Sequence, residues 1–211
     1  MYYIEEMFCH LSTHSYFSFL RGINSPAELI GAAAAAGMPA LGLADHHTLT
    51  GAVEFWLAGR KAGVRPVLGL TLTVDHGGTL RPLQVFAAGE MGWSNLCRLS
   101  SAVMLQSSDG APIQEDILAS CSRDLVAVSG SAEAGQGFLS WLREAFGDRA
   151  YAALRVSVTA DLEAARVTAG HAAAAGVKTV AMHPVYYLRA EQAPLQRSIS
   201  AIRLNTTVGA V

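Results

Sequence analysis

Histidines recur near the start of the chain with a spacing that could serve metal chemistry. His10, Ser12 and His14 alternate in an apolar segment that is typical of a strand. A strand has a period of two, so these three side chains should share one face. Imidazole nitrogens at alternate strand positions can bind one divalent ion together. This segment is therefore a candidate metal site.

A second polar group follows the next apolar run. Asp45, His46 and His47 are consecutive, so a histidine could supply a further nitrogen while Asp45 orients an imidazole. His183 follows a later apolar run in the same way. The alternative is that these histidines are polar residues of strand ends and turns, and the pattern alone leaves both interpretations open. A multinuclear centre normally needs bridging carboxylates, and Asp45 is the only acidic residue in these strand-end segments.

Other motifs give weaker indications of chemistry. The segment 42–51 lacks the glycine spacing of a dinucleotide loop, and no GxxxxGK[ST] sequence is present to bind nucleotide phosphates. The glycine- and serine-rich segment 128–137 could hold an anion at the next helix, but its composition is more typical of a turn. Ser129 and Ser131 lack the sequence context of a nucleophile elbow.

The elements that must position these residues alternate between short apolar runs and alanine-rich stretches, a pattern that favours a sheet covered by helices. We expect strands at 7–15, 40–44, 64–74, 80–88, 124–131, 153–158 and 177–187. We expect helices at 26–36, 49–62, 93–105, 136–146 and 161–175. The strands 64–74 and 80–88 should form a hairpin through the DHGGT turn, and 106–112 should be a surface loop.

The first helix and the number of strands carry the most structural information. Ser25 suits the N-cap, Pro26 the first helical position, Glu28 the capping-box partner and Gly37 the end of the helix. Seven strand units are enough to close an α/β barrel or to form a large doubly wound sheet. In a barrel, the carboxyl ends of parallel strands meet at one mouth, where the polar residues that follow the strands should gather.

Composition limits the class of protein. The 211 residues are 51% hydrophobic and 15% charged, so they can bury a sizeable core, and we expect one domain over 1–211. The net charge of −2 excludes a global attraction to nucleic acid or anionic lipid, and no apolar stretch approaches the roughly 20 residues of a membrane-spanning helix. Three widely spaced cysteines and the absence of a secretory signal favour a reducing cytoplasmic location.

Several separated blocks strongly resemble one family. The blocks 10–30, 35–74, 92–101 and 185–208 occur in the order found in the N-terminal PHP (polymerase and histidinol phosphatase) domain of bacterial DNA polymerase III alpha subunits. The sequences SFLRG and AIRLNTT are closer to the error-prone branch of these polymerases. The resemblance implies a distorted seven-stranded (β/α) barrel of the PHP type, in agreement with the strand count.

The resemblance also implies where a metal cluster would lie in metal-containing members. Of the ligand positions in that set, His14 and His46 are retained. The others are occupied by Ser12, Arg21, Thr71, Pro82, Ser131, Pro184 and Tyr186. Two imidazoles cannot hold a trinuclear cluster, and Arg21 would bring a fixed positive charge to the place of the cations, where it could bond Asp45 or strand-end carbonyls.

We therefore expect no cofactor, and at most one weakly bound zinc or manganese ion on His14 and His46, with His10, Asp45 and His183 nearby. The resemblance implies a structural or partner-binding module whose partners are polymerase catalytic modules or other replication and repair subunits. DNA would be contacted through the parent polymerase, and no membrane is involved. The alternative is a metal-dependent phosphoesterase or 3′–5′ proofreading exonuclease. Whether the chain is encoded alone or is part of a polymerase stays open.

Overall fold

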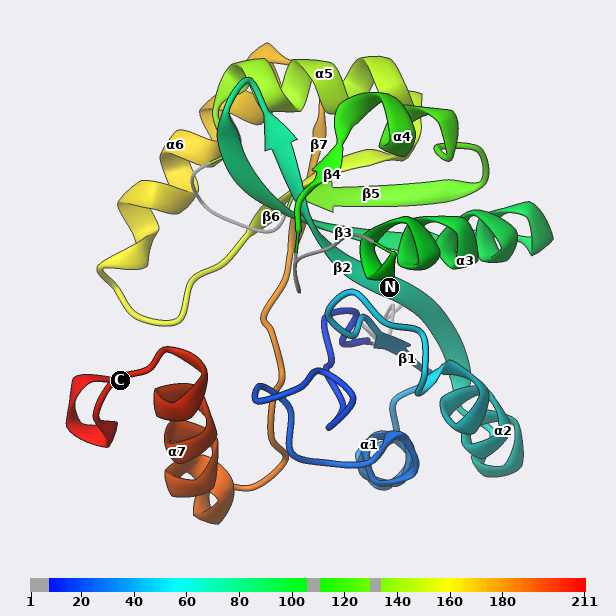
Figure 1. Cartoon of the computed structure of the whole chain (residues 1–211), viewed down its shortest axis with the longest axis vertical. Helices are drawn as coiled ribbons and strands as arrows, with labels where there is room; N and C mark the ends of the chain where they lie inside the picture. Colours follow the sequence, from blue (N-terminus) through cyan, green and yellow to red (C-terminus); the bar gives the residue numbers. More distant parts are fainter. Residues whose placement is uncertain (1–7, 106–110, 130–133) are drawn as a thin grey trace, which may run out of the picture. The chain divides into compact units, whose positions relative to one another are not determined.

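Strands and helices alternate along the computed structural model, which describes residues 8–105, 111–129 and 134–211 (Figure 1). The described backbone divides into two units by its contacts. Unit 1 contains the described residues up to Asp45, together with Thr50–Leu68 and Pro184–Val211. Unit 2 contains His46–Leu49 and the described residues of Gly69–His183.

The described residues form seven strands in a mixed sheet. The strands are β1 (Ala40–Leu43), β2 (Arg65–His76), β3 (Thr79–Ala87), β4 (Ile113–Gln114), β5 (Leu125–Ser129), β6 (Ala150–Leu154) and β7 (Lys178–Ala181). Their order is β1-β2-β3-β5-β6-β7, with β4 beside β2. The pairs β2–β3 and β3–β5 are antiparallel and the other pairs are parallel. The number of strands thus equals the seven that were expected, although β4 was not one of the expected strands.

Helices connect the strands. They are α1 (Pro26–Ala35), α2 (Ala52–Ala62), α3 (Glu90–Met104), α4 (Glu115–Ser120), α5 (Gln136–Phe146), α6 (Asp161–Ala174) and α7 (Ala193–Arg203). Short 3₁₀ turns occupy Gly147–Arg149, Ala190–Gln192 and Val208–Ala210. The helices α1, α2, α3, α5 and α6 confirm the five sequence predictions within a few residues, whereas α4 and α7 were not predicted.

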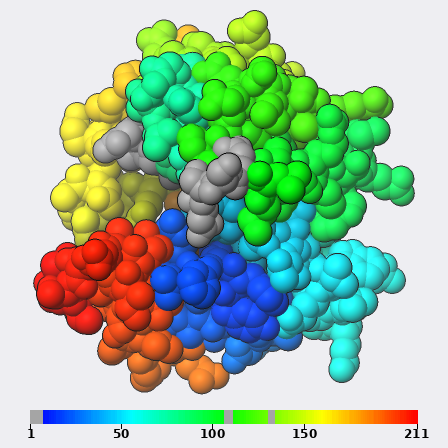
Figure 2. Space-filling model, viewed as in Figure 1, coloured from blue at the N-terminus to red at the C-terminus, as the bar shows by residue number. Residues whose placement is uncertain are grey.

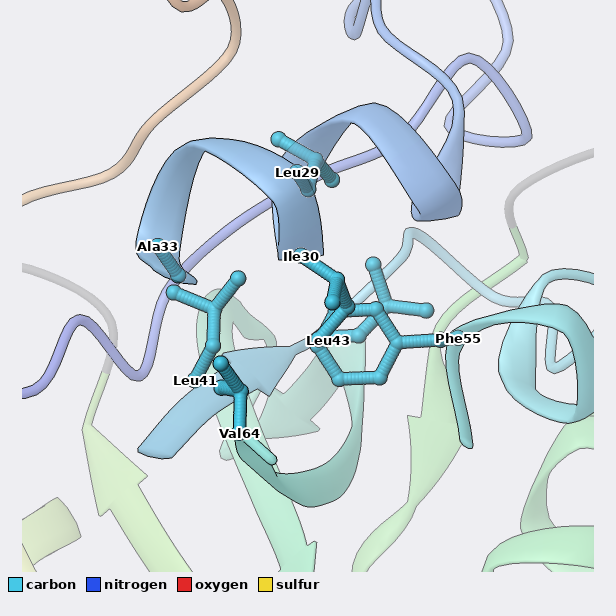
Figure 3. Close-up of a cluster of buried hydrophobic side chains, with 7 residues drawn as sticks. All are labelled: Leu29, Ile30, Ala33, Leu41, Leu43, Phe55 and Val64. Atoms are coloured by element: carbon cyan, nitrogen blue, oxygen red, sulfur yellow. The ribbon is translucent and has the colours of Figure 1, made fainter. Parts of the chain in front are cut away.

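Unit 1 has its own apolar core, formed where α1 and α2 pack against β1 (Figure 3). The cluster consists of Leu29, Ile30, Ala33, Leu41, Leu43, Phe55 and Val64. The predicted capping box that starts α1 is present, because Ser25 accepts from the Glu28 backbone N–H while the Glu28 carboxylate accepts from the Ser25 backbone. Burying this cluster fixes β1, which leads directly to Asp45.

Unit 2 is built on the predicted hairpin. β2 and β3 pair in antiparallel register from Gly69 opposite Phe86 to His76 opposite Thr79. Gly77 and Gly78 form the turn with φ of 58° and 77°, which explains the two glycines, since a tight hairpin turn of this hand needs positive φ at both positions. Helices α5 and α6 pack on β5, β6 and β7, and α3 packs on β3 (Figure 1).

The predicted strand 7–15 is wrong as a regular strand. Over its described part, Thr13 forms an isolated bridge to Val185, and no longer ladder is present. The carbonyls of His10 and Thr13 accept from the N–H groups of Gly42 and Ala44. The partners are thus three residues apart in this segment but only two residues apart in the chain opposite, which is the end of β1 and the residue after it. Such a mismatch disrupts a ladder as a bulge does.

The predicted strand 153–158 is also misplaced, because β6 lies at Ala150–Leu154. The backbone N–H groups of Ser157 and Val158 donate to the Asp161 carboxylate at 2.7 and 3.1 Å, at the start of α6. Local side-chain bonds of this kind compete with a sheet ladder. The predicted strand 177–187 likewise ends early, at Ala181, ahead of Pro184, which has no N–H to donate.

Candidate functional site

His14 lies in unit 1, where it contacts the segment around Val185. Its backbone N–H donates to the Val185 carbonyl at 2.9 Å, and Val185 N–H donates to Ser12 at 2.8 Å. This pairing brings Tyr186 beside His14, and the two rings stack with centroids 4.6 Å apart at 15°. His14 Nε2 lies 3.3 Å from the Ser12 hydroxyl oxygen. Ser12 and His14, two of the three residues predicted to share one face, therefore lie close together.

Burial determines the protonation state of His14. The side chain is 1% exposed, and loss of solvation lowers its pKa to about 3. A backbone hydrogen bond with Ala44 acts in the opposite direction, and the positive charge of Arg21 lowers the pKa further. The imidazole is therefore neutral at physiological pH.

This shift predicts a dependence of stability on pH. The folded pKa of about 3 lies below the unfolded value of 6.5, so protons favour the unfolded chain as pH falls below 6.5. By linkage, this group lowers the free energy of unfolding by about 2 kcal/mol between pH 7.5 and pH 5. In urea unfolding, we expect the free energy of unfolding of His14→Gln to fall by about 2 kcal/mol less than that of the wild type over this range.

The comparison with His14→Gln isolates this group from others. Asp45 acts oppositely, since its raised pKa makes the folded state bind a proton more readily than the unfolded chain. The pKa values of Glu28, Asp148 and Asp161 are lowered, so the stability that these carboxylates contribute is lost in acid. This loss is the same in the wild type and the variant. Equal pH slopes for wild type and variant would contradict a buried neutral His14.

Asp45 is held by serines. Its carboxylate accepts from the Ser15 backbone N–H and hydroxyl, both at 2.7 Å, and from the Ser18 hydroxyl at 2.6 Å. The side chain is 1% exposed, and burial raises its pKa while the hydrogen bonds from the two serines lower it. These serines lie 30 and 27 residues away, and no local spacing in the sequence signals the pairing. The carboxylate fixes the loop that follows His14.

Arg21 lies in that loop, three residues after Ser18. Its backbone N–H donates to the Ser18 carbonyl at 2.9 Å, and its charge acts on His14. Arg21 was expected to bond either Asp45 or strand-end carbonyls. Among the described residues there is no ion pair between Arg21 and Asp45, and the hydrogen bonds to Asp45 come from Ser15 and Ser18. Burial lowers the pKa of Arg21, the charge of Arg203 lowers it further, and the charge of Tyr186 raises it.

His46 and His47 belong to unit 2. His46 forms a bridge with Thr71, and the His47 backbone N–H donates to the Thr71 carbonyl at 3.0 Å. The His47 carbonyl accepts from the Ser100 hydroxyl at 3.0 Å, and its φ of 63° turns the chain. The Thr71 hydroxyl accepts from the Gln84 amide at 3.1 Å. Backbone pairing therefore holds this segment beside β2, while Thr71 is bonded to Gln84.

The remaining candidates are scattered over both units. His10, in unit 1, is partly buried with its ring edge-on to Phe8 at 4.6 Å. His183, in unit 2, is exposed, with Nδ1 3.5 Å from the Ser157 hydroxyl. Pro82 lies in β3 opposite Thr73. Ser131 falls outside the described residues.

These residues do not fit a multinuclear metal centre. Across the three described ranges, no group of three or more His, Cys, Asp or Glu side chains lies close enough to hold a metal ion. Three donors already bond the Asp45 carboxylate, and Tyr186 covers one face of the His14 ring. The arrangement can hold a loop rigidly, but it offers few ligand oxygens to a cation.

Comparison with known proteins gives the family. The model of the PHP domain matches residues 10–161. The chain is 31% identical over 217 residues to an error-prone DNA polymerase from Mesorhizobium japonicum, covering 97% of this chain and 19% of the relative. It is 37% identical over 131 residues to a DNA polymerase III subunit alpha from Escherichia coli, covering 60% of this chain and 11% of the relative. The chain thus spans about a tenth to a fifth of the length of these relatives.

Solved structures show the same fold. An amidohydrolase from Chromobacterium violaceum, with bound sulfate and no metal, has a TM-score of 0.59 at 15% identity and covers 84% of this chain and 87% of its own. A two-domain protein from Bacteroides vulgatus, containing a predicted PHP-like metal-dependent phosphoesterase, has a TM-score of 0.58 at 10% identity and covers 84% of this chain and 51% of its own.

These likenesses confirm the predicted α/β fold of the PHP type. Among the helices of the described residues, none has the length and apolarity that crossing a bilayer requires. The family model covers well over half of the chain, and the Mesorhizobium japonicum relative aligns with 97% of it. The chain belongs to the PHP domain family, with homologues among error-prone DNA polymerases and DNA polymerase III alpha subunits.

Proposed function

We propose that residues 1–211 form a single PHP domain of a polymerase of the DNA polymerase III alpha or error-prone type, and that this domain is a structural and partner-binding module. The observation that carries the proposal is the closed polar centre of unit 1. Tyr186 stacks on His14, and the Asp45 carboxylate is bonded by Ser15 and Ser18. These groups stabilise a loop rather than present open ligand positions to a reacting water.

The same proposal names partners and location. The homologues are DNA polymerases, so the partners would be polymerase catalytic modules or other replication and repair subunits. DNA would be reached through the parent polymerase, because the net charge of −2 gives this chain no general attraction for phosphates. A replicative or repair role of this kind implies a cytoplasmic location.

Any residual metal would be weakly held. The proposed ligands are His14 and His46, with His10, Asp45 and His183 as further candidates, and zinc or manganese as the ion. Binding must compete with the stack on His14 and with the hydrogen bonds to Asp45. One such ion at most fits this set of donors.

Metal analysis tests the degenerate site. We expect plasma emission on the purified protein to find well under one equivalent of divalent metal per chain, because bridging carboxylates are lacking. The matched control is the double variant His14→Ala with His46→Ala, which should give the same low value. Two or three ions per wild-type chain, lost in the double variant, would overturn the proposal.

The competing function is metal-dependent phosphoester hydrolysis, the activity predicted for the Bacteroides vulgatus protein, or 3′–5′ exonuclease activity. We expect hydrolysis of a model phosphodiester and of a single-stranded oligonucleotide to stay at background with added manganese or zinc. Cleavage by the wild type that the double variant abolishes would establish the competing function instead.

A further inference from the structure

One side of α2 is both apolar and exposed. Val53, Trp56 and Leu57 are 63%, 42% and 57% exposed. Arg60, one turn after Trp56, is exposed as well. The spacing of i, i+3, i+4 and i+7 places these four side chains, which we call the α2 face, on one side of the helix. Figure 2 shows side chains of α2, in cyan, at the molecular surface.

The opposite side of α2 is fixed in the core of unit 1. Ala52, Phe55 and Gly59 are buried, and Phe55 belongs to the cluster drawn in Figure 3. A Cβ at Gly59 would lie 2.8 Å from the Val64 carbonyl oxygen, so the helix lies directly against the chain that follows it. The helix cannot rotate without losing these contacts. The α2 face is therefore held rigidly, which lowers the entropic cost of binding a partner.

A cation–π contact joins the two largest residues of the face. The Arg60 guanidinium carbon lies over the Trp56 ring, 5.2 Å from its centre. This contact holds the positive charge beside the apolar side chains. Tryptophan and arginine are enriched among the residues that contribute most to the binding energy of protein interfaces. The composition of the face is thus typical of a protein interface.

The positive charge of this surface has no carboxylate partner within the described ranges, because neither Arg60 nor Lys61 has a carboxylate oxygen within 4.0 Å. The acidic residue of α2 is Glu54, and its carboxylate instead accepts from the Ala27 backbone N–H at 3.2 Å, in the first turn of α1. A partner that combines apolar side chains with carboxylates would match this surface in both hydrophobicity and charge.

Two other occupants match the surface less well. In a symmetric dimer a second copy would offer only the same four residues, and none of them is a carboxylate that Arg60 could bond. A nucleobase needs an open aromatic ring, whereas the Arg60 guanidinium already lies over Trp56. Val53 and Leu57 also give a nucleic acid backbone nothing to bond. An acidic amphipathic helix uses all four residues.

We propose that the α2 face is a docking surface for an amphipathic helix of a partner protein, in which aspartate or glutamate flanks an apolar stripe. The proposal rests on the partner-binding function proposed above and assigns it to one surface. Helical partners are anchored by apolar side chains at i, i+3, i+4 and i+7, the spacing that α2 also presents. Because α2 has 11 residues, the interface is small, and we expect a Kd of about 10–100 µM.

Fluorescence anisotropy of the whole chain with labelled helical peptides tests the surface. The probe is a peptide of about 18 residues, with leucine at i, i+3, i+4 and i+7 and glutamate on either side of this stripe. A second peptide has lysine at every glutamate position. We expect the wild type to bind the glutamate peptide at least fivefold more tightly than the lysine peptide, because only the first matches the charge of the surface.

Truncation of the apolar residues should weaken this binding. We expect Trp56→Ala and Leu57→Ala each to bind the glutamate peptide at least fivefold more weakly than the wild type. Leu195→Ala is the matched control, because Leu195 is 53% exposed on another helix of unit 1. Its affinity should stay within twofold of the wild type. An equal loss in Leu195→Ala would contradict a specific role of the α2 face.

Charge reversal gives a readout that loss of folding cannot imitate. Arg60→Glu should bind the lysine peptide at least threefold more tightly than the wild type does, and should lose the preference for glutamate. Arg197→Glu makes the same change of charge at an exposed position of α7 and should keep the wild-type preference. This gain keeps the test valid if Trp56→Ala does not fold.

A labelled thymidine oligonucleotide and sedimentation equilibrium test the other occupants. Oligonucleotide binding or self-association that Trp56→Ala abolishes would assign the α2 face to nucleic acid or to a second copy, and either result would overturn the proposal. Failure of the wild type to bind the glutamate peptide would overturn it as well. The proposed function is tested separately, by metal content and hydrolysis that depend on His14 and His46, so its failure is distinguishable from failure of this surface.

Discussion

Asp45→Ala is expected to lower the free energy of unfolding by about 4 kcal/mol, because three buried donors lose their acceptor and a cavity remains. The donors are the Ser15 backbone N–H, the Ser15 hydroxyl and the Ser18 hydroxyl, and both serines are 0% exposed. For a chain of 211 residues the Tm should fall by about 8–16 °C. Urea unfolding and calorimetry measure the two quantities.

The neutral isostere separates hydrogen bonding from charge. Burial is the largest influence on the raised pKa of Asp45, so removal of the charge returns part of the desolvation cost. Asp45→Asn keeps one acceptor oxygen and should lose only about 1–2 kcal/mol. Ser18→Ala, which removes one donor, should lose a similar amount. An Asp45→Ala protein as stable as the wild type would mean that the carboxylate does not hold this loop.

Gly22→Ala is expected to cost about 3 kcal/mol, because the added methyl group has no space. Its Cβ would lie 2.1 Å from the Ser15 carbonyl oxygen and 2.7 Å from that of His14. Both obstacles are backbone atoms, so a side-chain rotation cannot relieve the clash. The loop between His14 and Ile23 would have to move, which would also weaken the Ile23 to Tyr186 hydrogen bond. Chemical denaturation measures the loss.

Gly31→Ala provides the matched control for the same substitution in unit 1. Gly31 lies in α1 and is exposed, and apart from its chain neighbours and the nearby backbone of its own helix no atom lies within 4 Å of the position that an added methyl group would take. Alanine there should stabilise the protein by about 0.5–1 kcal/mol, since it favours the helix. If the Gly22→Ala and Gly31→Ala proteins are equally stable, the close backbone approach at Gly22 does not prevent a larger residue at this position.

Local features of the fold were predictable because their causes lie within a few residues. The capping box of Ser25 and Glu28 forms as expected, and Gly63 ends α2 with a left-handed φ of 72°. The hairpin of β2 and β3 follows from two apolar runs joined by Gly77 and Gly78. In each case the deciding hydrogen bonds or dihedral angles belong to neighbouring residues.

The limits of strands were harder to predict, because a strand needs a distant partner. The segment that contains His10 and Thr13 has strand-like alternation, yet its mismatch with β1 leaves a single bridge to Val185. The end of β6 was missed because Asp161 accepts the N–H groups that would have extended it. Apolar alternation reports a preference for extended backbone but carries no information about register.

The order of the motifs and the helical periodicity were enough to predict the fold family, most of the helices and the chemical types of the candidate ligands, since these signals run along the chain. The contacts of those side chains emerge only in three dimensions. Folding bonds Asp45 to serines about thirty residues away and stacks His14 on Tyr186. Burial, hydrogen-bond partners and pKa values depend on spatial proximity, which no local spacing in the sequence encodes.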